Sequence, residues 1–153
     1  MKWQGLFPGS RNRLLKFSLE FSVESLEIRD MENTEGFGYR KLIAYQKAKE
    51  VVKRTYKLLK KFPKEEQYAM CDQLRRASIS ITSNIAEGMN RYSVKDKNHF
   101  LEMAYGSLME VSSQFEIAEE LGYINNADRQ NMDVLIDEVA RLISGLQKSF
   151  KNE

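Results

Sequence analysis

The chain has 153 residues and a formal net charge of +2, with one cysteine and one histidine. One cysteine excludes an internal disulfide, and one cysteine with one histidine argues against a zinc site. No apolar run approaches the roughly 20 residues that a membrane helix needs. We therefore expect a cytoplasmic protein of bacterial type, without a membrane segment or a cofactor, in which one domain buries a core of its own.

Residues 1–38 lack the helical periodicity of the rest of the chain. The stretch Leu14–Ile28 alternates apolar and polar residues, which is typical of a strand, but no partner strand is predicted for it. The turn-forming sequence that follows predicts a flexible joint, and Met31 is an alternative translation start. We expect residues 1–38 to be a disordered or loosely packed extension, or in part untranslated, and residues 39–150 to form the folded domain.

A first helix of about 24 residues is predicted from Tyr39, because apolar residues recur at three- and four-residue steps until Pro63 ends it. The predicted core stripe is Tyr45, Ala48, Val52, Tyr56, Leu59 and Phe62. The other faces carry Lys47, Lys49, Lys53, Arg54, Lys57, Lys60 and Lys61. Residues 39–64 hold ten basic residues and one acidic residue, so these seven cations are candidates for binding nucleic-acid phosphates.

A second interpretation of the basic helix remains open. Residues 101–153 contain ten acidic and four basic residues, so the opposite half of the chain is acidic. The basic helix could lie beside acidic helices of the same subunit, and its charge would then be internal complementarity next to a solvated face.

The segment 65–90 has two conflicting patterns. The sequence "SISIT" alternates as a strand does, whereas helical spacing relates four apolar residues: Leu74, Ala77, Ile81 and Ile85. A strand would be unpaired in a helical core, with its backbone groups unsatisfied. We therefore predict a helix, with Glu65 and Glu66 suited to its positive N-terminus.

A polar stripe runs along this predicted helix: Arg76, Ser80, Ser83 and Glu87, with Asn84 beside it. Arg76 and Glu87 are about 16 Å apart along the axis, so they cannot pair with each other and each is expected to need a partner elsewhere. The stripe is either a solvated surface whose hydroxyls bond to the preceding turn, or a seam between helices or subunits. Ile79, which lies off the predicted core face, favours the seam.

Two more helices are predicted in the C-terminal half, with core stripes at Leu101, Ala104, Leu108, Val111, Phe115 and Ala118, and at Met132, Leu135, Val139, Leu142, Leu146 and Phe150. Ser93 and Asp96 form a capping-box pattern at the start of the first, and Gly122 is typical of its end. Asn125 or Asn126 can cap the second. Four helices with short connections predict an all-α, up-down-up-down antiparallel four-helix bundle.

No motif indicates an enzyme, because the chain has no glycine-rich phosphate loop and no HExxH sequence. His99 lies three residues from both Asp96 and Glu102, but a di-metal bundle site needs a second histidine. We expect His99 to be an exposed residue in the first turn of its helix.

Three tyrosines are less constrained by the predicted core: Tyr39, Tyr68 and Tyr92. Most other aromatic residues, such as Phe115, are expected to pack in the core. Tyr92 lies near Arg91 and Lys95, so it is the candidate for stacking on a nucleobase.

The stretches "FPKEEQYAMCDQLRRASISITSNIAEGMNRYS" and "FLEMAYGSLMEVSSQFEIAEELGYI" resemble the four-helix-bundle family of 23S rRNA intervening-sequence proteins. The most specific pieces are QLRRAS.SI.SNIAEG and A.GSL.E, and the resemblance spans residues 37–150. It implies a non-enzymatic bundle that assembles as a ring, commonly a homopentamer. The chain is also similar to the accessory protein of diversity-generating retroelements, a pentameric barrel that binds nucleic acid and the reverse transcriptase, although those proteins are usually strongly basic.

The resemblance implies that signature residues serve assembly or ligand contact. Together with the polar stripe, they define a candidate interface set: Arg75, Arg76, Ser80, Ser83, Asn84, Glu87 and Gly88. We expect a homo-oligomer that binds nucleic acid, RNA or DNA, through the basic helix. The alternative is a scaffold for a protein partner, such as an accessory subunit of a retroelement reverse transcriptase.

Overall fold

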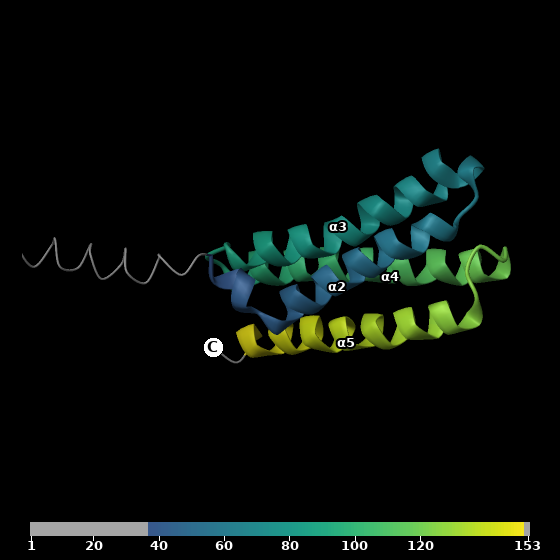
Figure 1. The fold of residues 1–153 in the computed structure, drawn as a ribbon. Coiled ribbons are helices and arrows are strands. Elements are labelled where there is room, and N and C mark those ends of the chain that lie inside the picture. The colour runs from purple at the N-terminus through teal and green to yellow at the C-terminus, as the bar shows by residue number, and fades with distance from the viewer. Residues whose placement is uncertain (1–36, 152–153) are drawn as a thin grey trace, which may run out of the picture. The chain divides into compact units, whose positions relative to one another are not determined.

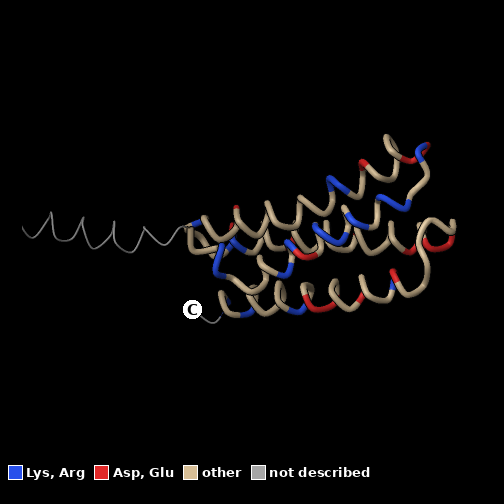
Figure 2. Tube along the Cα trace, viewed as in Figure 1, with Lys and Arg blue, Asp and Glu red and all other residues tan. Residues whose placement is uncertain are grey.

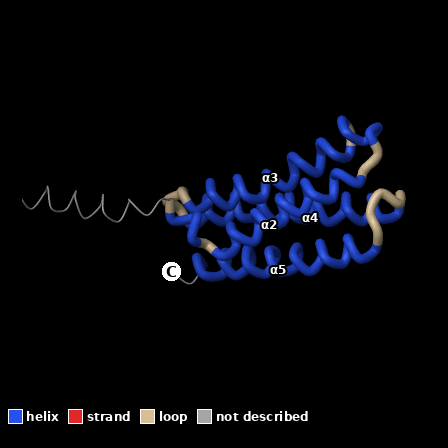
Figure 3. Tube along the Cα trace, in the orientation of Figure 1, coloured by secondary structure: helices blue, strands red, loops and turns tan. Residues whose placement is uncertain are grey.

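The structure is a computed structural model and describes residues 37–151. Four long helices dominate this part of the protein. They are α2 (Ile43–Leu58), α3 (Met70–Met89), α4 (Val94–Glu120) and α5 (Asn126–Lys151). Three short 3-10 helices accompany them: η1 (Gly38–Lys41), η2 (Leu59–Lys61) and η3 (Lys64–Tyr68). No strand occurs in the described range (Figure 3), so the predicted all-α class is confirmed. The predictions for residues 1–36 lie outside that range.

The long helices run up, down, up and down (Figure 1). Each packs against the next helix in the chain, and α5 packs against α2, so that α2 lies between α3 and α5. The most extensive contact joins α3 and α4. The predicted antiparallel four-helix bundle is therefore confirmed. None of the described helices has the length and hydropathy needed to cross a membrane.

The ambiguous segment is helical, but the prediction of one continuous helix over 65–90 is wrong: η3 ends at Tyr68, Ala69 has a non-helical φ of −116° and ψ of −103°, and α3 begins at Met70. Its hydroxyls bond to the backbone of the preceding turn: Ser78 Oγ donates to the Arg75 carbonyl at 3.0 Å, and Thr82 Oγ1 donates to the Ile79 carbonyl at 2.8 Å. These bonds satisfy polar groups on a helix that is weak by propensity. The alternation of "SISIT" is therefore compatible with a helix in which the Ser78 and Thr82 hydroxyls bond to the helix's own backbone.

The predicted caps of the last two helices are present. Ser93 Oγ accepts from the Asp96 backbone N–H at 3.0 Å at the start of α4. Gly122, just after α4, has a φ of 76°, a conformation that favours glycine. Asn125 Oδ1 accepts from the Asp128 N–H at 2.8 Å and caps α5. These local signals mark the end of α4 and the start of each of the last two helices.

The core draws apolar side chains from all four long helices. On α3 and α4 every residue predicted to be buried is buried: Leu74, Ala77, Ile81, Ile85, Leu101, Ala104, Leu108, Val111, Phe115 and Ala118. On α5 the prediction is right for the first half, but Ile143 is buried in place of its neighbour Leu142. The two adjacent apolar residues fit the same spacing, and packing against α2 and α4 selects one.

The stripe predicted on the first helix is right for Ala48, Leu59 and Phe62, which are buried, but wrong by one residue in the middle of α2. Val51 and Thr55 are fully buried, whereas Tyr56 is exposed. Because Val52 follows Val51 directly, two neighbouring stripes both match helical spacing, and the correct one contains a threonine. In the middle of α2 the buried side is therefore one residue away from the predicted one.

Candidate nucleic-acid interface

Three of the seven cations predicted on α2 are paired with α5. The pairs are Lys47 with Glu138, Arg54 with the carbonyl oxygen of Asn131, and Lys61 with Asp128. Nζ lies 3.3 Å from Oε1 in the first pair and 2.6 Å from Oδ2 in the third. The three cations recur every seven residues, or two helical turns, so they form one row along the α2–α5 contact.

These ion pairs change the proton affinity of the paired groups. A hydrogen bond from Lys61 holds the pKa of the Asp128 carboxyl below its ordinary value. A hydrogen bond to Glu138 raises the pKa of the Lys47 ammonium. For Lys47 and Lys61 the interpretation of internal charge complementarity therefore applies, whereas the partner of Arg54 is an uncharged backbone carbonyl.

Four lysines on the outer side of α2 and in the connection that follows it remain unpaired: Lys53, Lys57, Lys60 and Lys64. We call these four residues the basic strip. All are exposed, and none has an ion pair or a side-chain hydrogen bond within residues 37–151. The remaining predicted cation is Lys49, whose Nζ lies 5.4 Å from the ring centroid of Tyr45. Figure 2 shows basic residues along α2 and at the α2–α3 end of the bundle, and acidic residues along α5.

A groove between α2 and α5 adjoins the basic strip. Its volume is about 440 Å³, and it is lined by Arg54, Lys57, Leu58, Lys61, Asp128 and Asn131. Lys57 belongs to both the groove and the strip, while Asp128 is the one carboxylate of the lining. The cations of this groove can hold phosphate groups along α2. The cationic surface ends at Asp128 and Asn131 on the α5 side of the groove.

Part of the polar stripe of α3 faces α4 of the same chain. Ser80 Oγ lies 2.8 Å from Ser107 Oγ of α4. Asn84 Nδ2 donates to the Ser80 carbonyl at 2.9 Å and to Ser80 Oγ at 3.0 Å. The structure therefore places Ser80 and Asn84 in a seam between helices, which is one of the two kinds of seam predicted.

Gly88 continues this seam along α3. A Cβ atom added to Gly88 would lie 3.0 Å from Phe100 Cβ and 3.2 Å from the Lys97 carbonyl oxygen. Both atoms belong to α4, and one of them is backbone, so a side chain would push the helices apart. Glycine at this position allows α3 and α4 to approach closely.

The two charged residues of the stripe have local partners. Arg76 Nε lies 3.1 Å from Asp72 Oδ2, one turn back on α3, and Glu87 pairs with Arg91, one turn on. The expectation that each needs a distant partner is wrong, because both form i,i+4 pairs with neighbours of opposite charge. Ser83 and Ile79 stay exposed on the outer side of α3.

A family model described as 23S rRNA-intervening sequence protein matches residues 40–145. The chain belongs to this family. A crystal structure of a protein of unknown function from the S23 ribosomal protein family of Bacteroides thetaiotaomicron VPI-5482 is similar, with a TM-score of 0.62 and 23% identity. The match covers 69% of this chain and 99% of that chain, and it supports the same fold. Comparison with curated proteins gives no match.

In this member of the 23S rRNA-intervening sequence protein family, the two signature stretches meet each other. Ser80 lies in QLRRAS.SI.SNIAEG and Ser107 lies in A.GSL.E, and their hydroxyls share the hydrogen bond between α3 and α4. Sequence reasoning missed Ser107 as a partner, although its motif was the available signal. Arg75, also in the first stretch, donates from Nη1 to the Gln67 carbonyl of η3 at 3.3 Å.

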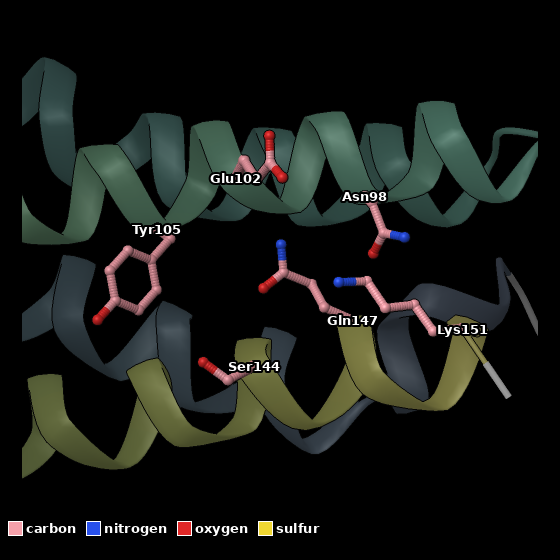
Figure 4. Close-up of a pocket in the computed structure, with 6 residues that line it drawn as sticks. All are labelled: Asn98, Glu102, Tyr105, Ser144, Gln147 and Lys151. Carbon is pink, nitrogen blue, oxygen red and sulfur yellow. The ribbon is translucent and has the colours of Figure 1, made fainter.

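A second, polar groove lies between α4 and α5, and sequence reasoning missed it. Its volume is about 300 Å³, and its lining is Asn98, Glu102, Tyr105, Ser144, Gln147 and Lys151 (Figure 4). Asn98 Oδ1 is buried without a hydrogen-bond partner among the described residues. None of the predicted binding residues lines this groove.

The structure assigns no chemistry to the histidine. His99 is exposed in the second turn of α4, one turn later than predicted, and its ring centroid lies 5.8 Å from that of Phe100. Within residues 37–151 no three metal-binding side chains gather in one place. The description of the family names no reaction.

Proposed function

We propose that this protein is a non-enzymatic RNA-binding protein whose basic strip contacts the phosphate backbone. The observation that carries the proposal is the division of the cations on α2: one row is paired with α5, and the strip is exposed and unpaired among the described residues. An exposed cation displaces counterions from a phosphate chain, whereas a paired cation does so weakly. Binding of this kind tolerates any sequence and weakens as salt rises.

The spacing of the strip supports contact with consecutive phosphates. Lys53, Lys57 and Lys60 follow each other at steps of about 4.5–6 Å along the helix axis. Lys64 extends the strip beyond the end of α2. In a homo-oligomer, which we propose as the working form, each copy adds a strip, so weak contacts sum through effective concentration.

Fluorescence anisotropy with a labelled RNA hairpin tests the proposal. We expect the wild-type protein to bind at about 50 mM salt and to weaken steeply by about 200 mM. The variant Lys53→Gln/Lys57→Gln/Lys60→Gln should lose affinity at low salt, and its slope of log affinity against log salt should be about 2–3 units shallower. Exposed substitutions of this kind leave the fold intact.

A matched control is Lys95→Gln/Lys148→Gln/Lys151→Gln, which removes the same charge from exposed lysines at the opposite end of the bundle. It should bind nearly as the wild type does. Absence of binding by the wild type at low salt, or equal losses in both triple variants, would exclude the basic strip as the site. If this protein shows no RNA affinity but a partner protein still co-purifies with it after nuclease treatment, the scaffold function is favoured.

A further inference from the structure

Tyr68 stands out among the aromatic residues because it shares a 3-10 helix with Lys64 of the basic strip. It ends η3, the 3-10 helix that begins with Lys64, and its side chain is 93% exposed. No ring contact of Tyr68 occurs within the described residues, whereas Tyr39 and Tyr45 pack edge to face with ring centroids 4.8 Å apart. A tyrosine ring exposed in this way has both faces available to a partner.

The backbone that carries Tyr68 is stabilised from several directions. Before it, the Gln67 carbonyl accepts from Arg75 Nη1 at 3.3 Å. After it, the Ala69 N–H donates to the Glu66 carbonyl at 3.1 Å. The exposed ring is therefore carried by a hydrogen-bonded, ordered turn.

Glu66 links the same turn to the rest of the bundle. Its Oε2 accepts from the Met70 N–H at 3.3 Å, and its Oε1 accepts from the Tyr123 hydroxyl at 3.1 Å. The Tyr123 ring packs against Phe62, with centroids 5.4 Å apart. The ring of Tyr68 is thus presented at a fixed place, which lowers the entropic cost of binding to it.

Charge around Tyr68 favours a base over a phosphate at the ring. Glu65, exposed about one 3-10 turn earlier, repels phosphate from this tip, while Lys64, at the start of the same 3-10 helix, attracts it. A nucleobase is uncharged and has two flat faces, so it is the part of a nucleic acid that fits an aromatic ring in this setting.

Tyr92, the residue favoured by the sequence, lacks such a setting. It is fully exposed in the turn between α3 and α4, but its neighbour Arg91 is occupied. Arg91 pairs with Glu87, and its guanidinium lies 4.6 Å from the Phe100 ring centroid. Among the described residues, Lys95 is then the exposed, unpaired cation that remains near Tyr92, whereas Tyr68 follows the four lysines of the basic strip.

We propose that Tyr68 is a stacking platform for one unpaired base of RNA whose phosphates lie on the basic strip. This inference rests on the proposed function and specifies its substrate class as single-stranded RNA. In a duplex the faces of each base are covered by neighbouring base pairs, so a duplex uses the strip alone. Single-stranded RNA uses the strip and the ring together.

The test compares Tyr68→Ala, Tyr68→Phe and the control Tyr92→Ala on a single-stranded RNA that contains 2-aminopurine and on a blunt RNA duplex. Tyr68→Ala should weaken single-strand binding at least about fivefold and abolish the change in 2-aminopurine fluorescence caused by stacking. It should leave duplex binding unchanged. Tyr68→Phe and Tyr92→Ala should behave as the wild type, and all should have the wild-type mass in solution.

Failure of this inference is distinct from failure of the proposed function. If the wild type binds both RNAs but Tyr68→Ala binds the single strand as tightly as Tyr92→Ala does, the stacking role is excluded and the strip remains. Equal losses on both RNAs, or an altered mass of Tyr68→Ala, would also exclude it, since these indicate a structural or assembly role. If the wild type binds neither RNA, the proposed function itself fails.

Discussion

At the scale of single residues, Gly88 shows how one missing side chain sets a helix contact. The nearest atoms to a methyl group added at this position belong to α4, at 3.0 and 3.2 Å, so alanine forces α3 and α4 apart. Gly106, on α4, has no atom within 4 Å of the same added carbon. The two glycines form a matched pair, one constrained by packing and one free of it.

We expect Gly88→Ala to lower the free energy of unfolding by about 1–2 kcal/mol, because the cost of overpacking exceeds the gain in helix propensity. Gly106→Ala should raise it by up to about 1 kcal/mol through propensity alone. Urea unfolding followed by circular dichroism measures both. Equal stability of the two variants would contradict the close contact between α3 and α4.

At the scale of elements, the row of ion pairs between α2 and α5 makes their contact sensitive to acid. The pKa of Asp128 is lowered in the folded protein, chiefly by the hydrogen bond from Lys61. A lowered folded-state pKa contributes stability that is present above the unfolded-state pKa, and that is lost as the pH falls through the folded-state value. The contribution is therefore complete near neutral pH and disappears in strong acid.

We expect Asp128→Asn to destabilise the protein by at most about 1 kcal/mol at neutral pH, because the pair is partly solvated. The difference from wild type should shrink as the pH falls below about 4. The control is Asp137→Asn, an exposed position on α5 with no ion pair within residues 37–151. Urea unfolding at several pH values gives the comparison, and a constant difference between wild type and Asp128→Asn would argue against the ionised pair.

The elements differ in how far the sequence predicts them. On α4 the predicted stripe from Leu101 to Ala118, at steps of three and four, is confirmed, and apolar neighbours of its members such as Met109 and Ile117 stay exposed. On α2 the adjacent valines leave two stripes open, and burial of Thr55 runs against the polarity of threonine. Which cations of α2 pair with α5 depends on that choice and on the register of α5, neither of which is a local property.

The candidate site is predictable only in part, for the same reason. Composition identifies α2 as the basic helix, but only tertiary contacts separate the paired row from the exposed strip. Lys64 falls outside the predicted site because it follows Pro63, where the predicted helix ends. The sequence favours Tyr92 over Tyr68, because the pairing of Arg91 with Glu87 spans a helix end that sequence reasoning does not resolve.

At the scale of the whole molecule, the bundle leaves apolar side chains on its outer faces. Ile79 of α3 is 45% exposed, and Val134 of α5 is 69% exposed. Scattered exposed apolar residues are common, but Ile79 lies on the side of α3 that carries no neighbouring helix. It is the residue through which we expect copies of the chain to associate, since the family resemblance implies a homo-oligomer.

Light scattering should give a mass five times the 17.9 kDa of one chain. Ile79→Glu should lower that mass while leaving the helical content unchanged, because a charge at a desolvated contact is costly but the side chain is not part of the core. Val134→Glu serves as the control on α5. A monomeric wild type, or an unchanged mass in Ile79→Glu, would rule out this assembly surface.

The hydroxyl contact between Ser80 and Ser107 has a consequence for how relatives of this protein diverge. The two side chains are in direct contact, so a bulky replacement on one helix is tolerated only if the side chain on the other helix becomes smaller. Aligned relatives should therefore show linked variation at these two positions. Among the same relatives, the lysines of the basic strip should instead change position by about one helical turn or be replaced by arginine. A phosphate chain recognises their charge and not their exact position in the sequence.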